Sequence, residues 1–362
     1  MMAGWRMLLP LISCLAAPAL AQPVPEATQD YGRSDAPFAI LVRSTTDIAL
    51  FGPVLDGFVA ANPDIRVDYE QWGSNDLYAV SLAECRSGAE TADLLISSAV
   101  DHQVKLVNDG CARSHISPLT EALPAEANWR DELFGITQEP AVMVYNSDVV
   151  PAQEAPRTRF DLIDLLRPEG SRYEGKVATY DIEESGLGYL FAFVDAQQAT
   201  TFGSLIEAFA RSRAVSTCCS AEIIDGVASG QYVLAYNVLG SYALDRAEQA
   251  DNLVVVAPQD YTLVLSRGAM IPRNAPNPVS AGLLLDFLVS DQGRRAMAAE
   301  HLYGDATAVA PDSLGQNEAV LRPIPLSPVL LVGLDRQKRA NFLALWRDTF
   351  ARPKRGAATP SE

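Results

Sequence analysis

From Phe38 onward the chain alternates short apolar runs with amphipathic stretches, and this alternation limits the possible folds more than any other feature. The apolar runs at 38–44, 65–72 and 92–98 fit buried strands, and each is followed by apolar residues at helical spacing. Repeated strand–helix–strand units imply a mostly parallel sheet with helices on both faces. The same pattern restarts after residue 150, which predicts an α/β protein with two lobes.

The last part of the sequence, from residue 278 onward, is helical and has no sheet of its own. We expect these helices to return to the first lobe, so that the chain passes between lobes near 138–147 and 253–266. The expected organisation is then residues 22–140 plus 260–362 in lobe 1 and residues 141–259 in lobe 2.

The first 21 residues have the features of a secretory signal peptide. Arg6 supplies a positive charge, an apolar segment follows it, and Ala19 to Ala21 form a small-residue cleavage motif. We expect cleavage after Ala21 and a periplasmic protein. The alternative is a lipoprotein anchored through Cys14, which follows a lipobox-like "LIS".

The formal net charge of −17 argues against nucleic acid as a partner, because a phosphate backbone requires a basic surface. It also argues against an anionic membrane surface. It does not exclude a small anionic ligand, which local helix dipoles can hold within an acidic protein.

Four cysteines follow the signal peptide. Cys85 and Cys111 lie at the ends of two predicted helices on either side of the strand at 92–98, and we expect them to form a disulfide. Cys218 and Cys219 are adjacent. For this pair we expect two partly buried thiols, with a vicinal disulfide as the alternative.

Small polar residues cluster where predicted strands pass into helices. Ligands of open parallel sheets lie beyond the carboxyl ends of the strands, where helix N-termini offer unpaired N–H groups. Helix capping alone explains one such residue at any single junction, but doubled hydroxyls recur in both lobes. The residues concerned are Ser44, Thr45 and Thr46, Ser97 and Ser98, Ser185 and Gly186, and Tyr236, Asn237 and Ser241.

The sequence contains no recognisable catalytic or metal motif. His102, His115 and His301 are not spaced as zinc ligands, and no Walker loop or G-x-S-x-G elbow is present. We therefore expect no enzyme activity, no cofactor and no bound metal.

The quoted segments together resemble a known family. The signal peptide, "ADLLISSAVDHQVKLVNDG", "GKVATYD", "SGLGYLF" and "LAYNVLGSYA" are similar to periplasmic solute-binding proteins of ABC importers, in the ferric-iron-transport and phosphoglycerate-regulatory group. The resemblance implies a type II periplasmic binding-protein fold: two lobes, two hinge crossovers and closure around a solute. It also implies a monomer that works with a permease and its ATPase.

The sequence departs from the ferric binders of this group at one place. They carry adjacent tyrosines in the segment that matches "LAYNVLGSYA", whereas here Asn237 follows Tyr236 and the next tyrosine is Tyr242. Amide and hydroxyl groups suit an oxyanion better than Fe³⁺. We therefore expect a small anionic organic solute, such as a phosphorylated or carboxylated metabolite, with Tyr145 and Tyr180 also lining the cleft.

Three alternatives to this function remain open at the level of sequence. The first is a ferric iron-binding protein of an ABC importer. The second is a sensor that presents its solute to a membrane histidine kinase. The third is an exported enzyme, for which turnover of a candidate solute would be the sign.

Overall fold

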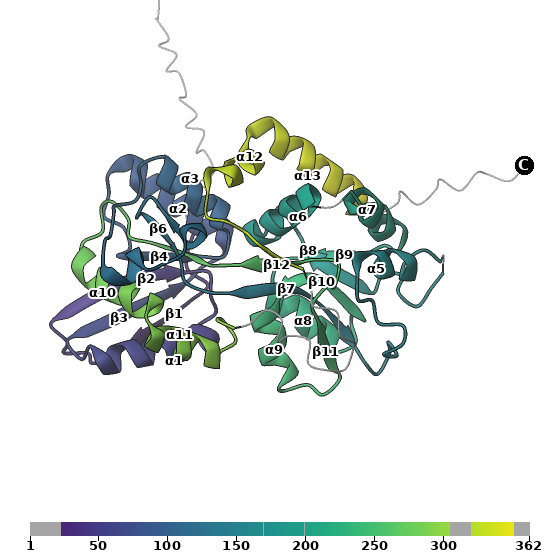
Figure 1. The fold of residues 1–362 in the computed structure, drawn as a ribbon, viewed down its shortest axis with the longest axis horizontal. Coiled ribbons are helices and arrows are strands. Elements are labelled where there is room, and N and C mark those ends of the chain that lie inside the picture. Colours follow the sequence, from purple (N-terminus) through teal and green to yellow (C-terminus); the bar gives the residue numbers. More distant parts are fainter. Residues whose placement is uncertain (1–22, 169, 199, 305–319, 351–362) are drawn as a thin grey trace, which may run out of the picture.

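The computed structural model describes residues 23–350, except residues 169, 199 and 305–319. The predicted signal peptide and Cys14 lie outside the described residues. Figure 1 shows two lobes side by side, each built from a sheet with helices packed around it. This confirms the predicted two-lobed α/β fold. Among the described residues, no helix has both the length and the apolar character needed to cross a membrane.

The first sheet contains seven strands in the order β1-β3-β2-β4-β13-β6-β5. The strands are β1 (Ala27–Tyr31), β2 (Phe38–Ser44), β3 (Ile65–Gln71), β4 (Leu94–Ser97), β5 (Asn128–Trp129), β6 (Leu133–Gly135) and β13 (Gly268–Met270). The helices of this lobe are α1 (Ile48–Ala61), α2 (Ser74–Ser87), α3 (Val100–Asn108), α4 (Pro118–Glu121), η1 (Ala125–Ala127), α10 (Pro278–Val289) and α11 (Asp291–Ala299).

The second sheet has the order β14-β12-β7-β10-β8-β9, with β11 also paired to β7. The strands are β7 (Glu139–Asn146), β8 (Val177–Tyr180), β9 (Val215–Thr217), β10 (Leu234–Leu239), β11 (Leu253–Val256), β12 (Thr262–Leu265) and β14 (Leu321–Pro323). The helices are α5 (Arg159–Leu165), α6 (Gly186–Gln198), α7 (Phe202–Arg211), α8 (Ser220–Ala228) and α9 (Gly240–Ala247).

Both sheets are mixed, whereas the sequence pattern predicted mostly parallel ones. In the first sheet β2 pairs in parallel with β3 and β4, but β13 runs antiparallel to β4 and β6. In the second, β8 is parallel to β9 and β10, but β7 runs antiparallel to its neighbours β10, β11 and β12. Part of the difference arises at β7 and β13, each of which directly follows a passage between lobes and therefore enters its sheet without a crossover helix. The pairs β1–β3 and β5–β6 are also antiparallel.

The C-terminal segment does not simply return to the first lobe, as the sequence suggested. The helices α10 and α11 pack against α1 and the first sheet, but β12 and β14 belong to the second sheet. The segment η2 (Pro328–Leu330) with α12 (Leu331–Leu334) contacts α3 of the first lobe, while α13 (Arg336–Phe350) contacts α7 of the second. Figure 1 shows α12 and α13 lying along one side of both lobes.

The reason for this placement is the apolar face of α13. Leu343 and Trp346 are buried in the hydrophobic cluster of the second lobe, and the ring of Phe342 packs against Tyr189 and Phe193 of α6. Burial of large aromatic side chains is worth several kcal/mol, so these contacts fix the helix to the second lobe.

Cys85 and Cys111 form a disulfide with a Cα–Cα separation of 5.5 Å, within the usual range. The bond joins the end of α2 to the segment after α3. Cys218 and Cys219 also form a disulfide, which corrects our expectation of two thiols. This second bond lies immediately before α8.

Candidate functional site

A cavity of about 600 Å³ lies between the two lobes. Its walls come from the ends of β2, β3, β4, β8, β9 and β10 and from the starts of the helices that follow them. Among the described residues it is lined by Glu26, Thr45, Asp47, Gln71, Trp72, Gly73, Ser74, Asn75, Asp76, Ser98, Tyr180, Glu184, Ser185, Leu187, Cys218, Cys219, Ser220, Ala221, Glu222, Leu239 and Tyr242. The junctions of both lobes therefore face one common space.

The doubled hydroxyls of the first lobe divide into a structural residue and a residue that faces the cavity. The Oγ of Ser97 accepts a hydrogen bond from the N–H of Ala99 at 3.1 Å, and Ser97 is buried. Ser98, one position later, lines the cavity, and its Oγ lies 3.1 Å from Oγ1 of Thr45. Because side chains alternate in direction at a strand end, only one residue of each pair can face the solute.

The wall of the second lobe is built around Tyr180 and Ser220. The hydroxyl of Tyr180, at the end of β8, is hydrogen-bonded to Oγ of Ser220, the first residue of α8. Burial raises the pKa of Tyr180, so its phenol stays protonated. Ser185 lines the cavity at the start of α6, where its Oγ accepts from the N–H of Gly188 at 3.0 Å.

Direct contacts join the lobes on two sides of the cavity. The N–H of Gly186 donates to Oγ of Ser74 at 2.9 Å, and Nδ2 of Asn75 donates to the carbonyl of Glu184 at 2.8 Å. Gly186 is required for this approach, because a Cβ there would lie 2.8 Å from Cε1 of His102.

On the other side of the cavity, the hydroxyl of Tyr242 in α9 donates to Oδ1 of Asp47 at 3.0 Å. It also accepts a hydrogen bond from the N–H of Asp47 at 3.2 Å. Asp47 directly precedes α1, so this reciprocal pair connects a helix start in each lobe. Burial raises the pKa of Tyr242, which keeps the phenol available as a donor.

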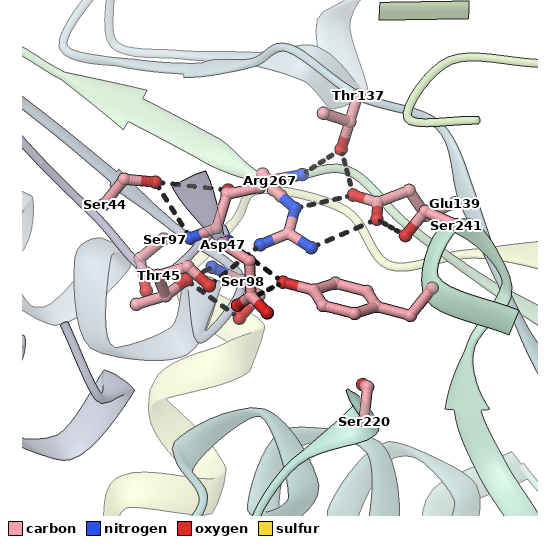
Figure 2. A network of polar contacts seen from close by, with 12 residues as sticks. Ser44, Thr45, Asp47, Ser97, Ser98, Thr137, Glu139, Ser220, Ser241 and Arg267 are labelled. Atoms are coloured by element: carbon pink, nitrogen blue, oxygen red, sulfur yellow. Dashed lines mark hydrogen bonds and ion pairs between the residues drawn. The ribbon is translucent and has the colours of Figure 1, made fainter. Parts of the chain in front are cut away.

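Beneath the cavity, a buried polar network lies where the chain passes between lobes (Figure 2). Nε of Arg267 is 2.8 Å from Oε1 of Glu139, and the Arg267 guanidinium also donates to the carbonyl of Thr45 at 3.3 Å. Thr137 and Ser241 each donate to the Glu139 carboxylate. Because the Arg267 guanidinium is paired with the Glu139 carboxylate, it does not offer a free positive charge to a solute.

The charged side chains that line the cavity are acidic. They are Glu26, Asp47, Asp76, Glu184 and Glu222, and no Lys, Arg or His belongs to the described lining. Positive potential comes instead from helix N-termini. The N-cap residues of α2 and α8 are Gly73, which has no side chain, and Cys219, whose side chain makes no capping hydrogen bond, so the first N–H groups of both helices have no side-chain cap. The cavity therefore combines carboxylate acceptors with N–H and hydroxyl donors.

The structure separates the predicted site residues into two groups. Thr45, Ser98, Tyr180 and Ser185 line the cavity. Ser44 and Thr46 do not, because both are fully buried and hydrogen-bonded to each other at the turn after β2, and Ser97 caps its own turn as described above.

The remaining predicted residues also lie behind the cavity wall. Tyr145 is buried in the hydrophobic cluster of the second lobe, and the hydroxyl of Tyr236 donates to Asp195 within that lobe. Asn237 is buried with φ of 64° at an irregularity of β10. Ser241 is bonded to Glu139, and Gly186 is covered by its contact with Ser74.

Sequence reasoning missed two junctions that contribute much of the lining. One is the passage from β3 to α2, which supplies residues 71–76, and the other is the passage from β9 to α8, which supplies residues 218–222. The "WGSND" stretch at 72–76 has the same strand-to-helix signature as the predicted junctions and indicates the first. β9 has only three residues, too few to be recognised from periodicity.

The described residues bring three potential metal-ligand atoms of His, Cys, Asp or Glu together only at Cys218, Cys219 and Glu222. The two sulfur atoms are bonded to each other, so they are not free thiolates that could bind a metal. The cavity as it stands therefore presents polar contacts rather than a preformed metal cluster of these residue types.

Comparisons with known proteins agree with this geometry. Residues 89–325 match the family model of bacterial extracellular solute-binding proteins. The substrate-binding protein of an ABC transporter from Agrobacterium tumefaciens is 35% identical, with a TM-score of 0.83 over 91% of this chain and 100% of that one. A comparison with curated proteins gave no significant match.

Two more distant structures share the fold. Iron-bound HitA from Pseudomonas aeruginosa is 16% identical, with a TM-score of 0.66 over 86% of this chain and 99% of that one. AfuA from Actinobacillus pleuropneumoniae, bound to fructose 6-phosphate, is also 16% identical, with a TM-score of 0.67 over 86% and 98% of the two chains.

Proposed function

This chain belongs to the family of bacterial extracellular solute-binding proteins, the non-enzymatic receptors of ABC transporters, and we propose that its solute is a small anionic organic compound. The interlobe cavity would capture a phosphorylated or carboxylated metabolite and deliver it to the permease and ATPase. The observation that carries the proposal is the convergence of Thr45 and Ser98 from one lobe with Tyr180, Ser185 and Ser220 from the other on one cavity.

The anionic group of the solute is best accommodated at the start of α8. The N-cap Cys219 leaves the first N–H groups of this helix without a side-chain acceptor, and the helix dipole favours negative charge there. The hydroxyls of Ser220 and Ser98 also line the cavity and supply further donors.

The acidic lining restricts the rest of the solute. Carboxylates such as Asp47 and Glu26 repel a second negative charge but accept hydrogen bonds from hydroxyl or amino groups. A metabolite with one anionic end and several hydroxyl groups fits both requirements. In keeping with this, one protein of the same fold was observed with fructose 6-phosphate.

Ferric iron is the second candidate, because several proteins of this fold are iron-bound or are described as ferric-binding, and the cavity is rich in oxygen atoms. Iron coordination by tyrosine requires phenolates. Each of the phenols of Tyr180 and Tyr242 is hydrogen-bonded to a neighbour, so iron would have to displace these contacts before either oxygen could coordinate it. This favours the organic solute.

The experiment is a thermal-shift screen of the purified mature protein with sugar phosphates, including fructose 6-phosphate, with small carboxylates and with Fe³⁺ plus citrate. A solute at 100 times its Kd adds about 2.7 kcal/mol to the free energy of unfolding. A response to an anionic metabolite supports the proposal. A response to ferric iron alone would overturn it.

We further propose that the protein is exported to the periplasm, with its signal peptide cleaved after Ala21, and that it acts as a monomer. Edman or mass analysis of the secreted protein gives the new N-terminus directly, and lipidation at Cys14 would contradict cleavage there. A role in presenting the solute to a sensor kinase is the alternative to transport, and deletion of the partner permease distinguishes the two through loss of uptake.

A further inference from the structure

The disulfide between Cys218 and Cys219 lies in the wall of the solute cavity. Cys218 directly follows β9, and Cys219 is the N-cap residue of α8. Both cysteines line the cavity, and Cys219 is exposed while Cys218 is partly exposed. The bond is therefore open to solvent and to small molecules that enter the cavity.

The contribution of this disulfide to the stability of the fold is small. A disulfide stabilises a protein mainly by closing a loop in the unfolded chain, and the benefit grows with loop length. Cys85 and Cys111 are 26 residues apart and constrain a whole strand and helix between them, whereas Cys218 and Cys219 are separated by a single peptide bond. Stabilisation of the fold therefore explains the Cys85–Cys111 disulfide but does not explain the Cys218–Cys219 disulfide.

The adjacent bond is also the more easily reduced of the two. One trans peptide bond holds the Cα atoms of Cys218 and Cys219 3.8 Å apart, below the usual range of about 4.4–6.8 Å for disulfides. Exposed disulfides outside the usual geometry are the labile ones. In addition, the positive end of α8 stabilises the thiolate that is released when the bond opens.

Opening the bond changes the part of the wall that meets the solute. The eight-membered ring formed by the bond and the peptide between the cysteines restricts the backbone at the N-cap of α8. Ser220, Ala221 and Glu222, the first residues of the helix, all line the cavity. Ser220 is in turn bonded to Tyr180 from β8.

We propose that Cys218–Cys219 is a redox-sensitive site that sets the conformation of the α8 N-terminus in the cavity. Reduction by a thiol reductant breaks the S–S bond and forms two S–H groups. The electrons and protons come from two reductant thiols, which become a disulfide. Reduction would free the backbone before α8 and lower the affinity for the solute. This last consequence rests on the proposed function, whereas the change in the wall does not.

The test uses the full mature protein equilibrated in a series of dithiothreitol redox buffers. Differential alkylation and mass spectrometry report each disulfide, and hydrogen exchange reports the amide of Ile223, which donates to the carbonyl of Cys219 at 3.0 Å in the folded protein. We expect Cys218–Cys219 to open in buffers that leave Cys85–Cys111 intact, and amide exchange in α8 to quicken by about tenfold, as for a loss of roughly 1.4 kcal/mol of local protection. Equal reduction of the two bonds, or unchanged exchange, would overturn the proposal.

The matched variant is Cys218→Ala with Cys219→Ala, which lacks the bond and does not add a serine N-cap to α8. It should exchange at Ile223 as the reduced protein does and should no longer respond to the reductant. Fructose 6-phosphate serves as the probe solute. If it binds, affinity should fall about tenfold on reduction, comparable to the loss of one strong hydrogen bond, and equal affinity in both states would contradict the link to binding. If fructose 6-phosphate binds in neither state, only the proposed solute is contradicted. The redox proposal is tested separately, by alkylation and hydrogen exchange.

Discussion

Arg267 and Glu139 form an ion pair at two of the places where the chain passes between the lobes. Nε of Arg267 lies 2.8 Å from Oε1 of Glu139, and the two side chains are 1% and 0% exposed. Replacing Glu139 with Gln would leave the guanidinium buried without its counter-charge. We expect Glu139→Gln to lower the free energy of unfolding by about 3–5 kcal/mol, measured by urea denaturation.

The exposed pair between Arg33 and Asp35 provides the control, since its side chains are 60% and 72% exposed. Asp35→Asn should leave the free energy of unfolding almost unchanged, because solvent screens such pairs. Similar losses of unfolding free energy in the two variants would show that burial does not determine the contribution of the Arg267–Glu139 pair.

The contact between Tyr242 and Asp47 predicts a variant that affects closure of the lobes more than folding. Tyr242→Phe removes a hydroxyl that both donates to and accepts from Asp47, while the ring stays in place. We expect a loss of about 1.5–3 kcal/mol in interlobe stabilisation, seen as weaker solute binding and a larger radius of gyration in X-ray scattering. Unchanged scattering and affinity would mean that the lobes stay together without this contact.

Because Ser98 faces the cavity and Ser97 does not, we expect replacement of Ser98 to affect solute binding and replacement of Ser97 to affect stability. Ser98→Ala removes a hydroxyl that lines the cavity and should weaken binding of the solute found in the screen about twofold to tenfold. Ser97→Ala removes the acceptor for the N–H of Ala99 and should lower stability by about 0.5–2 kcal/mol with little effect on affinity. Calorimetry for binding and denaturation for stability separate the two. The interpretation fails if Ser97→Ala is the variant with the weaker binding.

His102 predicts a loss of stability at mildly acidic pH. The imidazole is buried and stacked on Tyr78 at 4.4 Å, and burial lowers its pKa despite the neighbouring Asp101. Below about pH 6.5 the unfolded chain binds a proton at this residue that the folded protein does not, so stability falls as the pH is lowered. His102→Gln should flatten the dependence of unfolding free energy on pH between 7 and 5.

Asp101 supplies the control of opposite sign. Burial raises its pKa, so between its ordinary value and the raised one the folded state holds a proton that the unfolded state has released. This contribution increases stability as the pH falls, and Asp101→Asn should therefore steepen the loss attributed to His102. An unchanged slope in both variants would exclude these two groups as its cause.

The sequence predicted the two-lobed α/β fold and four of the residues that line the cavity, because periodicity reports strands and helices of ordinary length. It did not predict which member of a hydroxyl pair faces the solute. Ser97 and Ser98 are chemically identical, and the choice between them depends on the direction in which β4 ends.

The C-terminal region shows a second limit. The spacing of Phe342, Leu345 and Trp346 predicts an apolar face on α13, and the helix packs through Phe342 and Trp346, whereas Leu345 is 47% exposed. A single apolar face does not identify the surface that receives it. Nor could periodicity reveal β9 or the vicinal disulfide, because three residues show no period and adjacent cysteines have two chemical states.

The segment from Pro328 to Phe350 has a mechanical consequence. Its first part lies on α3 of the first lobe and its last part on α7 of the second, and the carbonyl of Gly333 accepts a hydrogen bond from Tyr189 of α6. If the lobes open, this segment must therefore lose its contacts with one of them or bend between α12 and α13. The contacts of residues 328–350 with both lobes thus limit how far the lobes can open, in addition to the strands that connect them.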